Sequence, residues 1–396
     1  MDLSLSPRHQ AFREEVRRFL AEHGHKAPRG HRGDHVAWQK LLIEHGYAAR
    51  FIPREYGGYG APPDILEARI IAEEFGRAQV SPGLQGQGVS MLVPTLLEVG
   101  TEEQKRRFIP PTLTGEMIWC QGYSEPQAGS DLASLRTSAV LDGDHWVVNG
   151  QKIWTSTARE ADWMFALVRT EPEAPKHEGI SFLLIDMRTP GIEVRPLVDM
   201  TMEANFNEVF FTDVRVPKEN IVGRRGEGWR IANLVLRHER GSLADPNAMM
   251  ARLLALIDLM KAERVDGRRA IDDPVLLDRL MRIEGRVQAL RANDLRLLSA
   301  KVNPDHGDPR VGLAGLLVKL ETTELRHELE GLAVDAMGEF GILYDRSPEL
   351  RAGGTWVRSW MYYLGLIIGG GTSQIQKNII AERGLGLPRE PRTARP

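Results

Sequence analysis

The sequence predicts an α+β protein of several domains: an N-terminal all-α domain, a middle antiparallel β-barrel-like domain and a C-terminal domain of the four-helix-bundle type. Two observations predict this order. Apolar residues recur at helical spacing in the first and last parts of the chain, and short β-branched or aromatic runs separated by turn residues fill the part between. We place the domains at residues 1–116, 117–225 and 226–388, followed by a loose basic tail at 389–396.

The helical parts show their period in the spacing of apolar side chains. Phe12, Val16, Phe19 and Leu20 fall on one face of a helix, and the Gly- and Pro-rich stretch 52–63 separates such segments. The period continues to about residue 113 and returns from residue 228 to residue 383. No repeat of about 33 or 40 residues is visible, so the helices predict packed bundles and not a solenoid.

The middle part contains the strand signals. Asp142 with Gly143, and Asn149 with Gly150, are the turn pairs expected where one strand doubles back on the next. We expect strands in the apolar runs at residues 117–123, 145–148, 163–168, 180–185 and 209–216.

Composition excludes several classes of function. The chain has 396 residues with 51 basic and 54 acidic side chains, and this balance argues against electrostatic capture of nucleic acid. No run approaches the roughly 20 apolar residues that span a bilayer, so we expect no membrane segment. Cys120 is the single cysteine, which rules out an intrachain disulfide and a thiolate metal cluster, and we expect no metal. We therefore expect a cytoplasmic protein.

A loop with the chemistry of a ligand site follows the first expected strand. Residues 123–131 (Tyr-Ser-Glu-Pro-Gln-Ala-Gly-Ser-Asp) must turn at Pro126 and Gly129. Such a loop can aim backbone N–H groups and the hydroxyls of Ser124 and Ser130 at a polar cofactor. The alternative is an ordinary hydrogen-bonded surface turn.

A second motif follows at residues 149–156 (Asn-Gly-Gln-Lys-Ile-Trp-Thr-Ser). The indole of Trp154 could cover a flat ring while Ser156 hydrogen-bonds its edge. The alternative is that Trp154 is a core residue of a strand.

The third motif lies near the C-terminus, at residues 369–374 (Gly-Gly-Gly-Thr-Ser-Gln). Glycines let a backbone approach a ligand closely, and we expect Ser373 and Gln376 to form a capping box that starts a helix through Ile379 and Ile380. A helix N-terminus behind glycines suits an anion or a carbonyl group. A plain tight turn between helices is the alternative.

Five motifs in this order resemble the acyl-CoA dehydrogenase family over essentially the whole chain. They are residues 55–58 (Glu-Tyr-Gly-Gly), 100–105 (Gly-Thr-Glu-Glu-Gln-Lys), 123–131, 150–154 (Gly-Gln-Lys-Ile-Trp) and 371–383, which begin Gly-Thr-Ser-Gln-Ile-Gln. The resemblance implies a flavoprotein with FAD between the β domain and the C-terminal bundle.

The resemblance also implies roles for individual residues. Residues of the β domain would hold the isoalloxazine: Tyr123, Ser124, Trp154 and Ser156. Ser130 would lie near both the FAD and the pantetheine of the substrate, and Gly371 would line the thioester site. Thr372 and Gln374 would contact the FAD, across a subunit boundary in at least a dimer.

The activity implied is the α,β-dehydrogenation of an acyl-CoA thioester to the 2-enoyl-CoA, with electrons passed to an electron-transfer flavoprotein. FAD takes up the hydride while the protein supplies a base and polarises the thioester carbonyl. We expect a homodimer or homotetramer, with heteromeric pairing as an alternative.

The base is the main departure from the familiar pattern. The best-known members carry a glutamate just before the Gly-Thr of the C-terminal loop, where this chain has Gly370. Glu239 is the candidate instead, because it falls on the apolar stripe of the helix that begins at Gly228, where desolvation raises the pKa of a carboxylate. Branched-chain and sterol side-chain relatives place their base at a similar Glu-Arg pair. The alternative is a simple ion pair of Glu239 with Arg237 or Arg240.

Two neighbours of Glu239 complete this region. His238 could act as a base, but it lies about 100° round the helix, and we expect an ordinary solvent-facing histidine. Arg240 stands where the family has an arginine near the CoA moiety, so we expect it to bind substrate; an exposed helix arginine is the alternative.

Two further stretches depart from the family. Residues 266–274 replace the usual Arg-x-x-Phe-Gly stretch, with Arg268 or Arg269 as a substitute, and residues 335–341 replace the loop that receives the adenine portion of FAD. Two alternative functions stay open: a non-dehydrogenating flavin-binding subunit, and a same-fold enzyme of the nitroalkane oxidase or desulfinase type. Gly370 also leaves space for branched or ring-bearing acyl groups.

Overall fold

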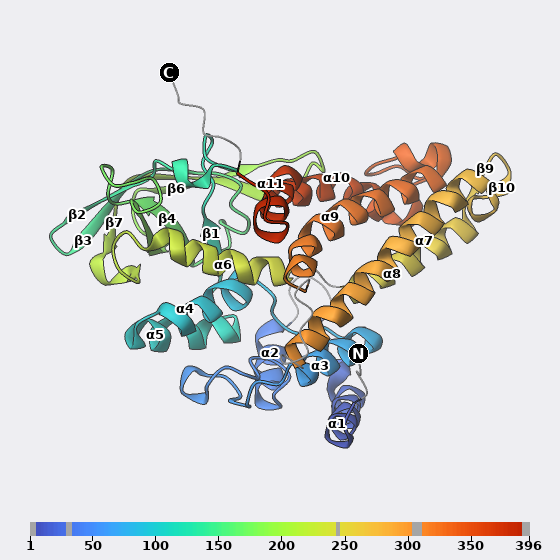
Figure 1. The fold of residues 1–396 in the computed structure, drawn as a ribbon, viewed down its shortest axis with the longest axis horizontal. Coiled ribbons are helices and arrows are strands. Elements are labelled where there is room, and N and C mark those ends of the chain that lie inside the picture. The colour runs from blue at the N-terminus through green and yellow to red at the C-terminus, as the bar shows by residue number, and fades with distance from the viewer. Residues whose placement is uncertain (1–4, 29–33, 243–245, 303–310, 390–396) are drawn as a thin grey trace. The chain divides into compact units, whose positions relative to one another are not determined.

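The computed structural model describes residues 5–28, 34–242, 246–302 and 311–389, with the backbone alone at 239–242 and 246. The chain forms two compact units, which divide between Gly241 and Ser242. We call residues 5–241 the first unit and residues 242–389 the second unit, and each is described by itself (Figure 1).

The first unit begins with the helices that the sequence predicts. Ser6 caps the first helix through a bond from the His9 backbone N–H, and Asp64 caps the third. A capping box of Thr101 and Gln104 starts the fifth. The helices are α1 (Pro7–His23), α2 (His35–Glu44), α3 (Ile65–Ala78), α4 (Val93–Val99) and α5 (Glu102–Thr114), with short turns of helix at Gly24–Lys26, Arg54–Tyr56 and Gly88–Leu92. Helices α1, α2 and α3 share a core that includes Phe12, Val16, Phe19 and Leu20, as their spacing predicts.

A sheet of eight strands follows in the same unit. The strands are β1 (Trp119–Gly122), β2 (Ser138–Asp142), β3 (His145–Lys152), β4 (Trp163–Arg169), β5 (Ile180–Asp186), β6 (Ile192–Leu197), β7 (Phe206–Pro217) and β8 (Ile221–Val222). Their order is β6-β7-β3-β2-β4-β5-β8, with β1 beside β4. All five predicted runs are strands, whereas β2, β6 and β8 carry too short or too polar a run to stand out. Most pairings are antiparallel as predicted, but β1 and β2 each pair parallel with β4.

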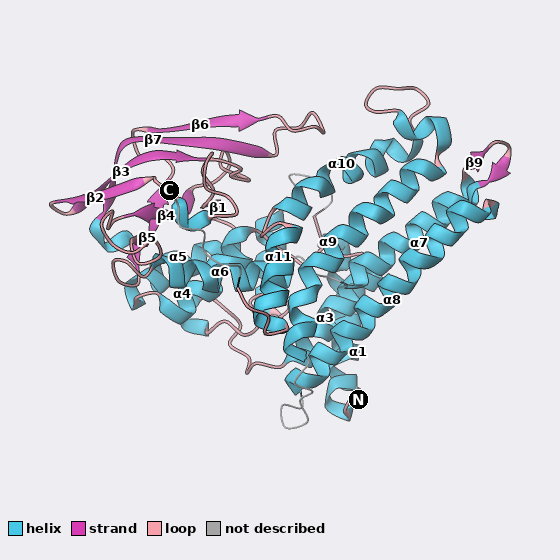
Figure 2. Cartoon of the chain, turned by 45° about the horizontal axis from the view of Figure 1, so that its top comes forward, coloured by secondary structure: helices cyan, strands magenta, loops and turns pink. Residues whose placement is uncertain are grey.

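Strands β4 and β5 are buried on both faces. Their side chains alternate, so Phe165 and Phe182 pack toward helices α4, α5 and α6 (Gly228–Ser242), while Met164 and Leu183 pack toward the inner side chains of β3 and β7. Figure 2 shows these helices beside the sheet. The double burial explains why both strands are continuous apolar runs in the sequence.

One predicted turn is wrong and one is confirmed. Strands β2 and β3 join at Gly143 as a hairpin, with Asp142 opposite His145. Asn149 and Gly150 instead lie inside β3, where the register against β7 shifts as a β-bulge. The extra residue lies on β7. Asn149 Oδ1 accepts the backbone N–H of Asp213 at 2.9 Å, and Asn149 Nδ2 donates to the Asp213 carboxylate at 3.0 Å.

Helix α6 packs within the first unit. Ile231, Ala232 and Val235 join the core that contains Phe165 and Phe182. The sequence predicts this helix as the start of the C-terminal bundle, but its buried side chains pack against the sheet and the N-terminal helices.

The second unit is a bundle of long helices (Figure 1). They are α7 (Pro246–Ala262), α8 (Pro274–Val302), α9 (Val311–Ala336) and α10 (Thr355–Ile368), followed by the short α11 (Ser373–Ile379). A hairpin of β9 (Arg264–Val265) and β10 (Arg268–Arg269) joins α7 to α8. The core includes Leu256, Ile283, Leu329 and Trp356, one residue from each long helix. A four-helix bundle is the arrangement that the returning helical period predicts.

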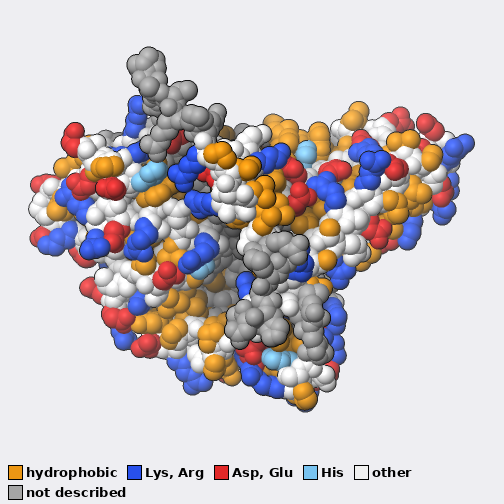
Figure 3. All heavy atoms as spheres, in the orientation of Figure 1, with side chains coloured by type: hydrophobic (Ala, Val, Ile, Leu, Met, Phe, Trp, Pro, Cys, Tyr) orange, Lys and Arg blue, Asp and Glu red, His pale blue; other side chains and the backbone are white. Residues whose placement is uncertain are grey.

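The surface agrees with the balanced composition. On the face drawn in Figure 3, basic and acidic side chains are interspersed. Among the described residues, no helix is long and apolar enough to cross a membrane.

Candidate flavin and thioester site

The structure brings the first two sequence motifs together in the first unit. The backbone N–H of Ile153 donates to the carbonyl oxygen of Ser124 at 2.9 Å, so the loop after β1 runs beside the end of β3. Tyr123 is buried against Phe165 and Phe182 with its ring edge-on to both. Ser124 and Trp154 therefore sit on adjacent backbone segments, as the resemblance requires.

A buried ion pair joins the same two segments. Lys152 and Glu125 are 0% and 4% exposed, and Lys152 Nζ lies 2.8 Å from Glu125 Oε1 and 3.1 Å from the carbonyl oxygen of Tyr123. The Glu125 carboxylate also accepts the backbone N–H groups of Arg136 and Thr137, at 2.6 and 2.9 Å. The sequence motifs contain both residues, but sequence reasoning missed their role. The signal was a lysine on the inward-facing register of a strand, which demands a buried partner.

Each of the two charges shifts the pKa of the other. Burial lowers the pKa of Lys152 to about 8, although the Glu125 carboxylate raises it in part. Burial alone would raise the pKa of Glu125, but the Lys152 ammonium and the backbone donors hold it below its usual value. The pair is therefore ionised at neutral pH.

Trp154 is presented to solvent and is not a core residue. Its side chain is 59% exposed, its φ is +60°, and its ring packs edge-on to Phe206 at 5.9 Å. Beside it, Thr155 and Asn207 are buried, and neither Thr155 Oγ1 nor Asn207 Oδ1 has a hydrogen-bond partner among the described residues. An exposed flat ring beside unsatisfied polar atoms is suited to an aromatic ligand with hydrogen-bonding edges.

Ser130 lies on the exposed part of the loop after β1. Glu125 and Ala128 pair through both of their backbone groups, at 2.9 and 3.0 Å, and Asp131 forms an ion pair with Lys176. Ser130 is exposed between these two fixed points, and Ser124 and Ser156 are half-buried. All three hydroxyls can take part in binding.

In the second unit, a buried lysine holds the glycine loop at residues 369–374. Lys319 of α9 is 2% exposed, and its Nζ donates to the carbonyl oxygens of Ile367 at 2.9 Å and Gly371 at 2.7 Å. Gln376 Nε2 donates to the carbonyl oxygen of Gly370 at 3.0 Å. Gly370 and Gly371 have φ values of +65° and +96°, which glycine adopts without strain.

The cap of helix α11 differs from the prediction. Thr372, and not Ser373, is the N-cap, and its hydroxyl accepts the backbone N–H of Ile375 at 3.2 Å. Gln376 turns back to Gly370 and so does not complete a capping box. Ser373 Oγ is buried and has no partner in the described part of the chain, whereas Gln374 is exposed.

The candidate base falls outside the described side chains. Glu239 and Arg240 belong to α6 by their backbone, and nothing further is described of them. Arg237 pairs with Glu98 at 3.2 Å. The expectation for His238 is wrong: its ring is half-buried, its Nε2 is buried with no partner among the described residues, and burial and Arg237 lower its pKa against the opposing effect of Glu98.

The two stretches that depart from the family form ion pairs within the second unit. Arg269 pairs with Asp272 through two bonds of 2.7 and 2.9 Å, while Arg268 is exposed on β10. Asp335 at the end of α9 pairs with Arg279 at 2.7 Å. Arg268 is therefore better placed than Arg269 to meet a ligand.

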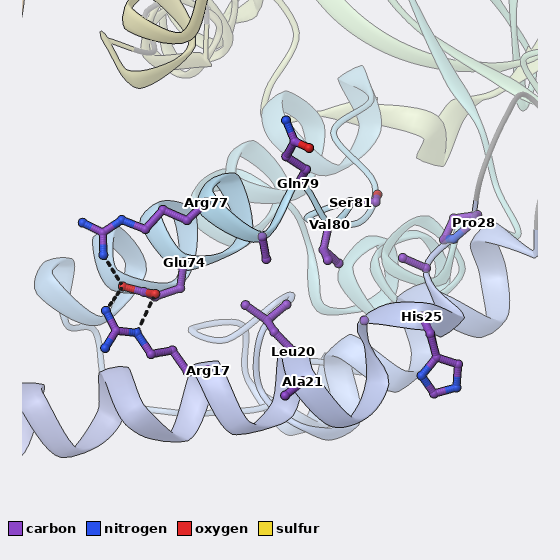
Figure 4. A pocket seen from close by; sticks show the side chains of 13 residues that line it. Arg17, Leu20, Ala21, His25, Pro28, Glu74, Arg77, Gln79, Val80 and Ser81 are labelled. Atoms are coloured by element: carbon purple, nitrogen blue, oxygen red, sulfur yellow. Dashed lines mark hydrogen bonds and ion pairs between the residues drawn. The ribbon is translucent and has the colours of Figure 1, made fainter.

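A cavity of about 610 Å³ lies elsewhere in the first unit, at the C-terminal ends of α1 and α3 (Figure 4). Leu20 and Val80 form part of its apolar wall, and Arg17 and Arg77 both pair with Glu74 at its edge. None of the predicted site residues lines it, so it is separate from the motifs described above.

The chain belongs to the acyl-CoA dehydrogenase family. Family models match it in sequence order: the N-terminal domain over residues 6–116, the middle domain over 120–214 and the C-terminal domain over 226–385. Members of this family are FAD-dependent oxidoreductases that act on CH–CH groups, and the chain is a flavoenzyme of this class.

Individual relatives cover nearly the whole chain. "Acyl-CoA dehydrogenase IpdE1" of Mycobacterium tuberculosis strain H37Rv is 39% identical over 358 residues, which are 89% of this chain and 88% of that protein. Among solved structures, a chain of the ChsE4-ChsE5 complex from Mycobacterium tuberculosis has a TM-score of 0.80 at 31% identity and covers 98% of this chain and 100% of its own. A chain of the "Tcur3481-Tcur3483 steroid ACAD" has the same TM-score at 29% identity, with 98% and 100% coverage.

The residues present fit FAD. The unsatisfied Thr155 and Asn207 oxygens flank the exposed Trp154 in the first unit, and the unsatisfied Ser373 hydroxyl adjoins Thr372 in the second. Buried polar atoms normally find partners, so these three atoms are available to a ligand with hydrogen-bonding groups.

Proposed function

We propose that this chain catalyses the α,β-dehydrogenation of an acyl-CoA thioester to the 2-enoyl-CoA and passes its electrons to an electron-transfer flavoprotein. The observation that carries the proposal is the exposed Trp154 indole, set in a left-handed backbone turn beside Ser124 and two unsatisfied buried oxygens. FAD, when bound, supplies the hydride acceptor. Tyr123, Ser124, Trp154 and Ser156 would hold its ring, and Thr372 and Gln374 of a neighbouring subunit would contact the FAD.

Glu239 is the proposed base. Helix α6 buries the face that carries Ala232 and Val235, and Gly370 can accept no proton. A carboxylate near that face removes the α-proton of the thioester more readily because desolvation raises its basicity. Ser130, Arg240 and Gly371 would bind the CoA thioester.

The proposed substrate carries a bulky acyl group. Gly370 has no side chain where the best-known members of the family have a glutamate, which leaves room for a branched or ring-bearing chain. One of the solved structures that this chain resembles is named a steroid ACAD. A fused-ring acyl-CoA is therefore the substrate class to test first.

We propose at least a dimer. Two relatives are named as two-component assemblies, so a second, different chain is as good a candidate partner as a second copy. Sedimentation of the FAD-loaded protein, alone and with a co-expressed relative, tests this point. A FAD-loaded monomer at micromolar concentration in both cases would contradict it.

The proposed reaction is tested with Glu239→Gln, which keeps size and hydrogen bonding but removes the proton acceptor. We expect the FAD content to survive and anaerobic flavin reduction by a ring-bearing acyl-CoA to slow by about 10²–10⁴-fold. Glu227→Gln is the matched control, because Glu227 precedes the same helix and pairs with Arg224. Reduction of Glu239→Gln at the parental rate would exclude Glu239 and make His238 the next candidate. A parent flavin that no acyl-CoA reduces would instead favour a non-dehydrogenating subunit.

A further inference from the structure

Two segments that carry proposed flavin ligands are joined by one buried ion pair. Lys152 is the last residue of β3, two residues before Trp154, and its ammonium donates to the carbonyl oxygen of Tyr123 and the carboxylate of Glu125 on the neighbouring loop. Both side chains are at most 4% exposed, so neither contributes a charge to the protein surface. The pair joins the two motifs at the positions where each turns toward solvent.

The carboxylate also closes the loop that carries Ser130. Glu125 starts this loop, and the N–H groups of Arg136 and Thr137, at its end, donate to the two oxygens of the Glu125 carboxylate. The Arg169 side chain supports the same loop by donating to the carbonyl oxygens of Ala133 and Leu135. Ser130 therefore belongs to a loop whose two ends are held by one side chain.

A charge pair at this place has a geometric effect that an apolar contact would not have. Charge-assisted hydrogen bonds are short and directional, so five bonds on one carboxylate and one ammonium determine where each backbone segment lies. Removing both charges together leaves no buried unpaired ion, so the fold can survive. The position of one motif relative to the other then becomes less fixed.

We propose that the buried Lys152–Glu125 pair is a positioning device for the flavin site, which holds the segments 123–131 and 150–156 in one register. This inference rests on the proposed function, in which those segments hold the FAD ring. Neither residue is assigned contact with the cofactor. Both act through the backbone of Tyr123 and of the loop that carries Ser130.

The test is the double variant Lys152→Met/Glu125→Gln, compared with Arg50→Met/Glu67→Gln. The control pair lies in the same unit with an Nη2–Oε2 distance of 2.7 Å and side chains 14% and 7% exposed, and it contacts neither motif. The readouts are thermal unfolding and the rate of FAD release from diluted holoenzyme, followed as the rise of flavin fluorescence.

We expect both variants to melt at lower temperature and only the Lys152/Glu125 variant to release FAD faster, by at least about tenfold, with an altered flavin absorption spectrum. Equal release rates in the parent and both variants would overturn the proposal and leave a purely structural pair. If the double variant fails to fold, Lys152→Arg decides, since it keeps the charge and changes the geometry: unchanged FAD release would then overturn the proposal. Turnover with acyl-CoA is measured separately, so a failure of the proposed reaction is distinguishable from a failure of the positioning role.

Discussion

The ammonium of Lys319 lies 2.7 Å from the carbonyl oxygen of Gly371, so a buried charge on α9 holds the loop that carries Thr372 and Gln374. The same group bonds the carbonyl oxygen of Ile367 near the end of α10, where a positive charge also interacts favourably with the helix dipole. The glycine loop is thus held in part by a side chain 52 residues earlier in the sequence.

Replacing Lys319 by Met should destabilise the protein by about 2–3 kcal/mol, because two carbonyl oxygens lose a charged donor. Chemical denaturation measures the change. Lys261→Met is the control, since Lys261 is an exposed lysine of α7 in the same unit, with its side chain 59% exposed. A Lys319→Met midpoint equal to that of the control would show that the two bonds contribute nothing.

Trp154→Ala should change stability by less than about 1 kcal/mol, because the side chain is 59% exposed and its ring packs edge-on to Phe206. FAD release should accelerate by about tenfold if the indole covers the flavin ring. Trp119→Ala is the contrasting variant: its side chain is 2% exposed, and its loss should cost about 3–5 kcal/mol. Unchanged FAD release from Trp154→Ala would remove Trp154 from the flavin site.

Gly150→Ala should destabilise by about 2–4 kcal/mol, since strain and overpacking add at this position. Its φ is +146°, and an added Cβ would lie 2.7 Å from Thr137 Cα, which is backbone and cannot move aside cheaply. Gly143→Ala is the matched control, because Gly143 also has a positive φ, of +59°, but nothing lies within 4 Å of the added atom. That change should cost only about 1 kcal/mol. Equal losses in thermal unfolding would contradict the bulge geometry.

Acid should weaken the first unit through Glu125. Its pKa is held below the usual value in the folded chain, so the unfolded chain binds the proton more readily. The stability that the ionised group contributes is therefore present at neutral pH and is lost as the pH falls below about 4.3 and through the folded value. Between pH 7 and about pH 3, the melting temperature should fall more for the parent than for Lys152→Met/Glu125→Gln. Parallel curves would show that Glu125 has no part in the acid sensitivity.

Local patterns in the sequence determined the helical parts, five of the eight strands of the large sheet and the order of the three parts. Phe12, Val16, Phe19 and Leu20 have helical spacing and do share a helix face in a core, and the apolar runs at 163–168 and 180–185 are strands buried on both sides. Motif residues also indicated candidate ligand loops at 123–131, 149–156 and 369–374, whereas the flavin roles of these residues are implied by the family resemblance and stay predictions.

Only the tertiary structure decided which residues hold those motifs in place. Asn149 and Gly150 have the composition of a turn, yet they lie inside β3 opposite a bulge of β7, where the Asn149 side chain bonds Asp213, 64 residues away. Lys152 with Glu125, and Lys319 with Gly371, are likewise contacts between distant segments. Sequence patterns report on neighbours within a few residues, whereas the cost of burying a charge is settled by whatever partner the folded chain brings to it.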